Sequence, residues 1–204
     1  MYPNVANISE TLAKIGYLYI PKVPVQSLEE ILDMLGRVIF VTDVKVKPES
    51  KALVTSAKAL RFHTDHSRAK YILWYCIEQC SQGGETLLLD ANEVFEQLEI
   101  EHQNSLARIH LYEHKVFEDD PESHPLILYQ NGKRLFYYSF WLLNEEDKNN
   151  PALIAFEQAI QKANPVRFKL QPSDVLVIDN QRILHARTQI GGDRKRWLKR
   201  YWIS

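Results

Sequence analysis

The pattern of apolar and polar residues changes near residue 60. Before it, the segment 27–36 places leucine and isoleucine residues at helical spacing along one face. Ser27 is its expected N-cap, Glu30 the capping-box partner and Gly36 the residue that ends the helix. The other elements expected in this part are a helix over 8–14 that ends at Gly16 and a strand over 17–20. Residues 1–59 are therefore expected to form a helical and mixed N-terminal part.

After residue 60 the chain consists mostly of short runs rich in β-branched and aromatic residues, separated by turn residues. Asn131-Gly132 between two such runs predicts a hairpin with a type I′ turn. The predicted strands cover 71–76, 86–89, 108–117, 126–129, 134–140, 166–170, 175–179 and 197–203. Two helices are expected among them, one over 90–98 capped by Asp90 and one over 150–165 with Pro151 in its first turn.

Many short strands with few helices favour a mostly β, α+β class protein in which helices pack outside a β-sandwich or jelly roll. A parallel βαβ fold is disfavoured because strands and helices do not alternate regularly. At 204 residues the chain is expected to be one domain, residues 1–204, with its jelly-roll core in 60–204.

Net charge, apolar run length and cysteine content indicate which partners and which cellular compartment to expect. The net charge is −1, from 25 Lys+Arg against 26 Asp+Glu, so there is no general attraction to nucleic acid or to an anionic membrane. No apolar run is long enough for a transmembrane helix, and the N-terminus does not resemble a secretory signal. The two cysteines, Cys76 and Cys80, are read as free thiols of a reducing compartment, so a cytoplasmic location is expected.

The motif with the sharpest chemical meaning is "RFHTDHS" at 61–67. His63 and Asp65 are two residues apart, so on an extended segment their side chains leave the same face. An imidazole and a carboxylate that converge in this way supply two thirds of the 2-His-1-carboxylate set that binds Fe(II) and leaves positions open. A hydrogen-bonded surface pair of His and Asp would give the same short pattern.

A second group of candidate residues lies near the C-terminus. A buried-looking strand leads through a turn to "RILH", which ends at His185, and Arg196 follows eleven residues later. A third ligand followed by an arginine on the next strand is what a dicarboxylate co-substrate at a metal requires. A guanidinium holds its far carboxylate in bidentate fashion better than an ammonium does.

With these blocks in view, the sequence resembles the taurine dioxygenase-like family of Fe(II)/2-oxoglutarate-dependent oxygenases, which includes clavaminate synthase-like and γ-butyrobetaine hydroxylase-like members. The resemblance covers about residues 60–203. It is carried by "FHTDHS" at 62–67, "GGETLLLDANEVFEQL" at 83–98, "HPLILYQNGKRLFYYS" at 124–139 and "DVLVIDNQRILHARTQIGGDRKRWLKRYW" at 174–202.

The resemblance implies a double-stranded β-helix, that is, a cupin-like jelly roll, and assigns roles to single residues. His63, Asp65 and His185 match the iron ligands. Thr86 and Arg196 match the residues that bind the distal carboxylate of 2-oxoglutarate, and Arg200 matches an arginine that contacts an anionic substrate group in some members. On a strand, Arg196, Leu198 and Arg200 would share the inner face.

The implied activity is hydroxylation or desaturation of an unactivated C–H bond, with Fe(II), 2-oxoglutarate and O2 as cofactors and with succinate and CO2 released. Asp65 disfavours halogenation, because related halogenases carry Gly or Ala at that position. The expected substrate is a small amino-acid-like or carboxylate-bearing metabolite. The chain is short for the family, so an open pocket that also admits a group tethered to a carrier protein or peptide is expected. The oligomeric state is not readable.

Two other classes of protein keep the same fold and remain open at this stage. One is a non-oxygenase cupin-like metal-binding protein, and the other is an inactive jelly-roll binding module. Neither needs an arginine pair after the last ligand.

Several other histidines and both nearby tryptophans are expected outside the ligand set. His66 faces away from His63, and His110 and His114 lie on a strand-like segment, so all three are expected to be structural or surface residues. Trp74 and Trp141 are expected in the core or pocket wall. The substrate is expected to contact loops over 41–60 and 139–150.

Overall fold

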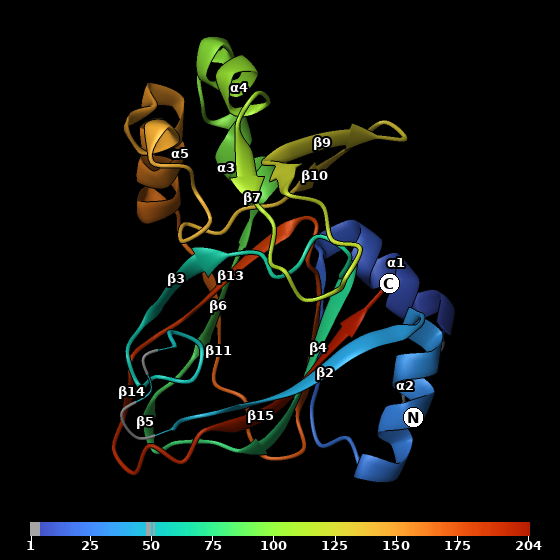
Figure 1. The fold of residues 1–204 in the computed structure, drawn as a ribbon. Helices are drawn as coiled ribbons and strands as arrows, with labels where there is room; N and C mark the ends of the chain where they lie inside the picture. The colour runs from blue at the N-terminus through green and yellow to red at the C-terminus, as the bar shows by residue number, and fades with distance from the viewer. Residues whose placement is uncertain (1–4, 48–49, 51) are drawn as a thin grey trace.

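Two antiparallel sheets face one another in the computed structural model, which describes residues 5–47, 50 and 52–204 (Figure 1). The larger sheet has the order β1 (Tyr17–Ile20), β12 (Val175–Asp179), β4 (Tyr71–Glu78), β15 (Trp197–Ile203) and β2 (Val38–Lys45). The smaller has the order β11 (Val166–Phe168), β6 (Thr86–Asp90), β13 (Ile183–Arg187) and β3 (Leu60–His63). Strands from distant parts of the chain alternate in both sheets, so the mostly β class and the double-stranded β-helix are confirmed.

The central strands β12 and β4 of the larger sheet are buried on both faces. Side chains alternate along β4: Ile72 and Trp74 point into the core between the sheets, whereas Leu73 and Tyr75 pack outward. The same alternation continues on β12. A strand buried on both faces reads as a continuous apolar run, which is why "YILWYC" and "VLVI" were visible in the sequence.

Helices α1 (Val5–Ile15) and α2 (Leu28–Leu35) cover the outer face of this sheet (Figure 1). Gly16 ends α1 at φ +81°, as predicted. The capping box at Ser27 is wrong: Ser27 belongs to a 3-10 turn, η1 (Val25–Ser27), and its side chain makes no cap hydrogen bond.

A second layer of short elements lies at one end of the sheets (Figure 1) and encloses its own apolar core. It contains α3 (Ala91–Glu96), α4 (Ile100–Leu106), β7 (His110–Tyr112), β8 (Ser123–Pro125), β9 (Ile127–Gln130), β10 (Lys133–Phe136), η2 (Glu146–Asn149) and α5 (Pro151–Lys162). At the other end, β5 (Gln82–Gly83) pairs with β14 (Ile190–Gly191). Asp90 and Asn150 cap α3 and α5 with their side chains. Asn131 and Gly132 both have positive φ in a two-residue turn, which confirms the type I′ hairpin.

Some expected boundaries are wrong. The strand expected over 108–117 is only β7, because the backbone N–H groups of Val116 and Phe117 donate to the side chain of Asp120 instead of to a neighbouring strand. The strand expected over 134–140 ends at Phe136. The strand β2 occupies part of an expected loop, and α4 was not predicted. No helix in the described ranges is both long and apolar enough to cross a membrane.

Candidate active site

The register of one strand pair places two histidines side by side. In the smaller sheet, His185 of β13 is paired directly with His63 of β3, and their ring centroids lie 4.2 Å apart. The residues are 122 positions apart in the chain, so only the closing of the jelly roll brings them together. Both are almost fully buried.

Asp65 joins this pair from the loop that follows β3. Its backbone N–H donates to the side-chain oxygen of Asn180 at 2.8 Å, and the amide nitrogen of Asn180 donates to the carbonyl of Ala69 at 2.8 Å. The intervening Thr64 exchanges hydrogen bonds with the backbone of Tyr138. The loop is therefore held on both sides, and the carboxylate is fixed in position.

The three side chains form a compact donor set for a metal ion. Oδ1 of Asp65 lies 3.7 Å from Nε2 of His63 and 3.7 Å from Nε2 of His185, and the candidate ligand atoms all lie within 4.8 Å of one another. Two imidazoles and one carboxylate on one side of a metal are the donor set of non-haem Fe(II) oxygenases. The residues present fit such an ion.

The protonation states also fit a cation. Nδ1 of His63 donates to the carbonyl of Arg61 at 2.8 Å, which leaves the lone pair of Nε2 free. Burial lowers the pKa of His63 to about 4 and lowers the pKa of His185 well below its usual value. Both rings are therefore neutral at physiological pH.

The second oxygen of Asp65 is occupied by protein donors. Oδ2 accepts from Nη1 of Arg200 at 2.7 Å and from the indole Nε1 of Trp202 at 2.8 Å. Burial raises the pKa of Asp65, but Arg200, the two histidines and the hydrogen bond from Trp202 outweigh it and lower the pKa to about 2. Oδ1 remains as the oxygen that faces the histidines.

Aromatic side chains enclose the histidines. Trp74 meets His185 edge to face at a centroid distance of 5.0 Å, and Trp141 lies 4.9 Å from His63. Both tryptophans lie where the sequence analysis put them, in the wall of the site. Of the loops expected to contact substrate, 139–150 contributes Trp141 beside His63. The segment 41–60 contributes Val44, Val54 and Leu60 to the cavity described below, although its first five residues belong to β2.

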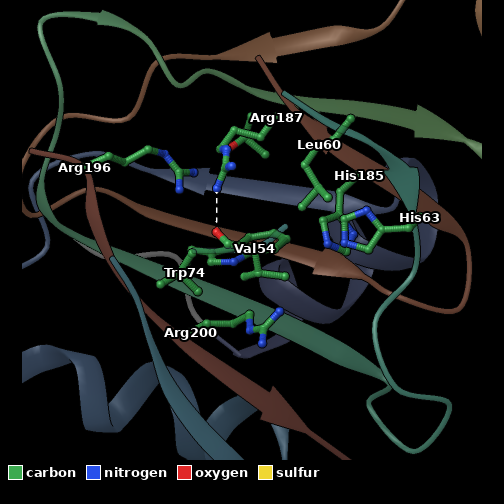
Figure 2. A pocket seen from close by; sticks show the side chains of 11 residues that line it. Val54, Leu60, His63, Trp74, His185, Arg187, Arg196 and Arg200 are labelled. Atoms are coloured by element: carbon green, nitrogen blue, oxygen red, sulfur yellow. Dashed lines mark hydrogen bonds between the residues drawn. The ribbon is translucent and has the colours of Figure 1, made fainter. Parts of the chain in front are cut away.

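A narrow cavity of about 40 Å³ extends from the histidines between the sheets (Figure 2). Thr86 and Arg196 line it together, as do Arg200 and Val54. Arg196 is buried, and its Nε donates to the carbonyl of Gly84 at 3.0 Å. Leu198 is also buried, which confirms the inner face predicted for Arg196, Leu198 and Arg200.

The structure adds three residues that the sequence analysis missed. Trp202 and Asn180 hold Asp65, and Arg187 lines the cavity from β13. The alternation of β13 could have revealed Arg187, because it lies two residues after His185 on the same face. Nothing in the sequence alone pairs Trp202 or Asn180 with Asp65.

Three histidines expected to be structural or surface residues lie outside the metal donor set. His66 is fully buried, and its Nε2 lies 3.0 Å from Oδ2 of Asp120. His110 is exposed, and His114 packs 5.9 Å from Trp141.

Comparison with known proteins agrees with this geometry. A family model described as "Taurine catabolism dioxygenase TauD, TfdA family" matches residues 4–202. Similar solved structures include an asparagine oxygenase in complex with Fe(II), 2S,3S-3-hydroxyasparagine and succinate, at a TM-score of 0.78 and 15% identity over 98% of this chain and 78% of that one. The non-heme iron oxygenase OrfP in complex with Fe and alpha-ketoglutaric acid matches at a TM-score of 0.74 and 17% identity, over 96% of this chain and 77% of that one. A taurine dioxygenase from Burkholderia xenovorans matches at a TM-score of 0.74 and 19% identity, over 100% of this chain and 83% of that one. At these identities the likeness shows a shared fold.

Proposed function

Because this chain belongs to the taurine catabolism dioxygenase TauD, TfdA family, we propose that it is an Fe(II)- and 2-oxoglutarate-dependent dioxygenase. The reaction would hydroxylate an unactivated C–H bond of a small amino-acid-like or carboxylate-bearing metabolite and release succinate and CO2. The observation that carries this proposal is the buried convergence of His63, Asp65 and His185 beside a cavity lined by Thr86 and Arg196.

The three converging side chains would hold the iron. Ferrous iron bound there supplies the activation of O2 and the oxidising chemistry, with 2-oxoglutarate as the electron source. The protein itself contributes the positions and protonation states of the ligands: the imidazoles are neutral and the carboxylate is ionised, as metal binding requires. Burial between two sheets keeps bulk water away from the reacting groups.

The arginines of β15 and its preceding residue have separate tasks in this proposal. Arg196 and Thr86 would bind the distal carboxylate of 2-oxoglutarate in the cavity. Arg200 already donates one nitrogen to Asp65, and its buried Nε has no hydrogen-bond partner among the described residues. That nitrogen is available for an anionic group of the substrate.

The substrate class is supported by the structural neighbours. The solved asparagine oxygenase carries a hydroxylated asparagine, and OrfP has been solved with (3S)-hydroxy-L-Arg. The proposal extends to substrates tethered to a carrier protein or peptide. A cytoplasmic setting is part of the proposal, and the free thiols of Cys76 and Cys80, both buried, are compatible with it.

The test is an anaerobic titration of the protein with Fe(II) and 2-oxoglutarate, followed by visible absorption. Wild type should develop a weak metal-to-ligand charge-transfer band and should form succinate once O2 is admitted, whereas Asp65→Ala should do neither. Asp43→Asn is the matched control, because Asp43 pairs with Trp197 on the outer face of the sheet. Wild-type protein that binds the metal without the band, or an Asp65→Ala variant that keeps full turnover, would contradict the proposal.

The same titration separates the alternatives. A cupin-like metal-binding protein without oxygenase activity would bind the metal but not 2-oxoglutarate. An inactive binding module would bind neither.

A further inference from the structure

Arg187 is a buried cation that neither the metal donors nor the expected 2-oxoglutarate contacts explain. It lies on β13 two residues after His185 and is 5% exposed. In the smaller sheet it is paired directly with Thr86 of β6, so both side chains face the same cavity from neighbouring strands. Figure 2 shows its guanidinium on the same side of the cavity as that of Arg196.

The two terminal nitrogens of Arg187 bind one segment of chain. Nη1 donates to the carbonyl of Val54 at 2.7 Å (Figure 2). Nη2 donates to the carbonyls of Ser56 at 2.7 Å and Lys58 at 2.8 Å, and more weakly to Leu53 at 3.3 Å. We call residues 53–58 the cavity wall, because Val54 lines the cavity.

The charge of Arg187 has no counter-ion in the described part of the chain. Its acceptors are neutral carbonyls, and its buried Nε donates to no group there. Arg196 is in the same situation: its described hydrogen bond goes to a carbonyl, and no carboxylate is paired with it among the described residues. Burial and the charge of Arg187 lower the pKa of Arg196 to about 9. Two buried guanidiniums without an anion are unfavourable, so the cavity is built to receive an anion.

We propose that Arg187 is a second guanidinium for the distal carboxylate of 2-oxoglutarate, acting beside Arg196, and that the same side chain holds the cavity wall in place. This inference rests on the function proposed above. A carboxylate has two oxygens and accepts several charge-assisted hydrogen bonds. In this proposal, the unpaired Nε of Arg187 donates to the distal carboxylate, while Nη1 and Nη2 keep their hydrogen bonds to the carbonyls of the cavity wall.

The proposal implies that 2-oxoglutarate binding and the ordering of the cavity wall are coupled. An anion that fixes the guanidinium of Arg187 also fixes the carbonyls of the cavity wall that it binds. By linkage, whatever orders the wall favours 2-oxoglutarate binding, and 2-oxoglutarate binding orders the wall. Residues 53–58 should therefore respond to the distal carboxylate although only Val54 among them lines the cavity.

The first experiment compares two ligands on two proteins. Calorimetry on the protein loaded with Mn(II) measures the Kd of 2-oxoglutarate and of 2-oxobutyrate, which lacks the distal carboxylate. Arg187→Gln should weaken 2-oxoglutarate binding by about tenfold or more and leave 2-oxobutyrate within about twofold. Mn(II) affinity should not change. The matched control is Arg182→Gln, since Arg182 also donates to backbone carbonyls, those of Ala13 and Lys14, but does not line the cavity.

The second experiment measures hydrogen exchange of residues 53–58. In wild type, 2-oxoglutarate should protect this segment and 2-oxobutyrate should not; in Arg187→Gln, saturating 2-oxoglutarate should add no protection. Equal weakening of both ligands would show that Arg187 only supports the fold and would overturn the proposal. Should the variant not fold, hydrogen exchange of the wild type tests the proposal: protection of residues 53–58 by 2-oxoglutarate alone supports it, and equal protection by 2-oxobutyrate overturns it. If wild type binds Mn(II) but not 2-oxoglutarate, the proposed function itself fails.

Discussion

The indole Nε1 of Trp202 donates a 2.8 Å hydrogen bond to Oδ2 of Asp65, the carboxylate at the centre of the candidate metal site. Trp202 lies on β15 two residues after Arg200, and both bind the same oxygen. With Oδ2 held by two donors, the carboxylate can rotate little, and Oδ1 stays directed at the histidines. Trp202 is thus a positioning residue for a proposed metal ligand.

Replacing Trp202 by Phe keeps an aromatic ring but removes the donor. Loss of an outer-shell hydrogen bond of this kind lowers metal affinity by about 10- to 100-fold, and we expect that range for Fe(II) or Mn(II) measured by calorimetry. Trp197→Phe is the control, because Trp197 donates its Nε1 to Asp43 on the outer face of the same strand. Equal metal affinities in the two variants would show that the bond from Trp202 does not matter.

Gly84 keeps Arg196 in its place. Its φ is +70°, and a Cβ there would lie 2.6 Å from Sγ of Cys80 and 3.1 Å from Cδ of Arg196. Gly84→Ala should therefore displace Arg196 and weaken 2-oxoglutarate binding, in addition to about 1–2 kcal/mol of stability lost to the left-handed backbone. Gly132→Ala shares the positive φ but meets nothing within 4 Å, so it should show only the backbone cost. Calorimetry and chemical denaturation of both variants separate the two effects, and equal 2-oxoglutarate affinities would refute the displacement.

Much of the site could be predicted because its residues lie in short motifs. The spacing of His63 and Asp65 predicted a shared face, the family resemblance pointed to His185, Thr86 and Arg196, and the structure brings these residues together. Asp65 lies in the loop after β3 and Arg196 just before β15, so the strand period alone does not explain their placement. Trp202 and Asn180 could not be paired with Asp65 from the sequence, because the contacts are made across the sheets by residues more than a hundred positions away. Nothing local in the chain records such a contact.

The fold was predictable where burial is two-sided and less so elsewhere. The strands β4 and β12 are apolar in all but their last residue because both their faces are covered. In contrast, β2 lies at the edge of its sheet and is half exposed, so its sequence "VIFVTDVK" has a mixed pattern that does not predict a strand. The strand expected over 108–117 does not extend to residue 117, because the backbone N–H groups of Val116 and Phe117 donate to the side chain of Asp120 instead of to a neighbouring strand.

Asp120 should matter for stability more than its exposed neighbour. Oδ2 accepts from His66 and from the backbone N–H groups of Val116 and Phe117, and Oδ1 lies 3.1 Å from Nε of Arg68. Oδ1 makes no hydrogen bond with the described residues but lies against the guanidinium of Arg68. The amide nitrogen of Asp120→Asn must therefore face either the three donors at Oδ2 or the cation at Oδ1. We expect a loss of about 1–3 kcal/mol in chemical denaturation. Asp119→Asn, at an exposed site, should cost far less, and similar losses in both variants would argue against this role.

The metal-free protein should lose stability as the pH falls below about 6.5. His63 has a pKa of about 4 in the folded state against 6.5 unfolded, and the pKa of His185 is lowered in the same direction, both because of burial. Between pH 6.5 and 4 the unfolded chain therefore binds more protons than the folded one, and the free energy of unfolding falls with pH by up to about 1.4 kcal/mol per unit for each group. Asp65, with a pKa of about 2, stays ionised across this window and adds no slope.

His63→Gln should flatten the profile measured by denaturation at successive pH values, whereas His110→Gln, at an exposed position, should leave it as in wild type. An unchanged slope in His63→Gln would show that this ring is not held neutral, and with it the physical basis for a preformed metal ligand at that position would be lost.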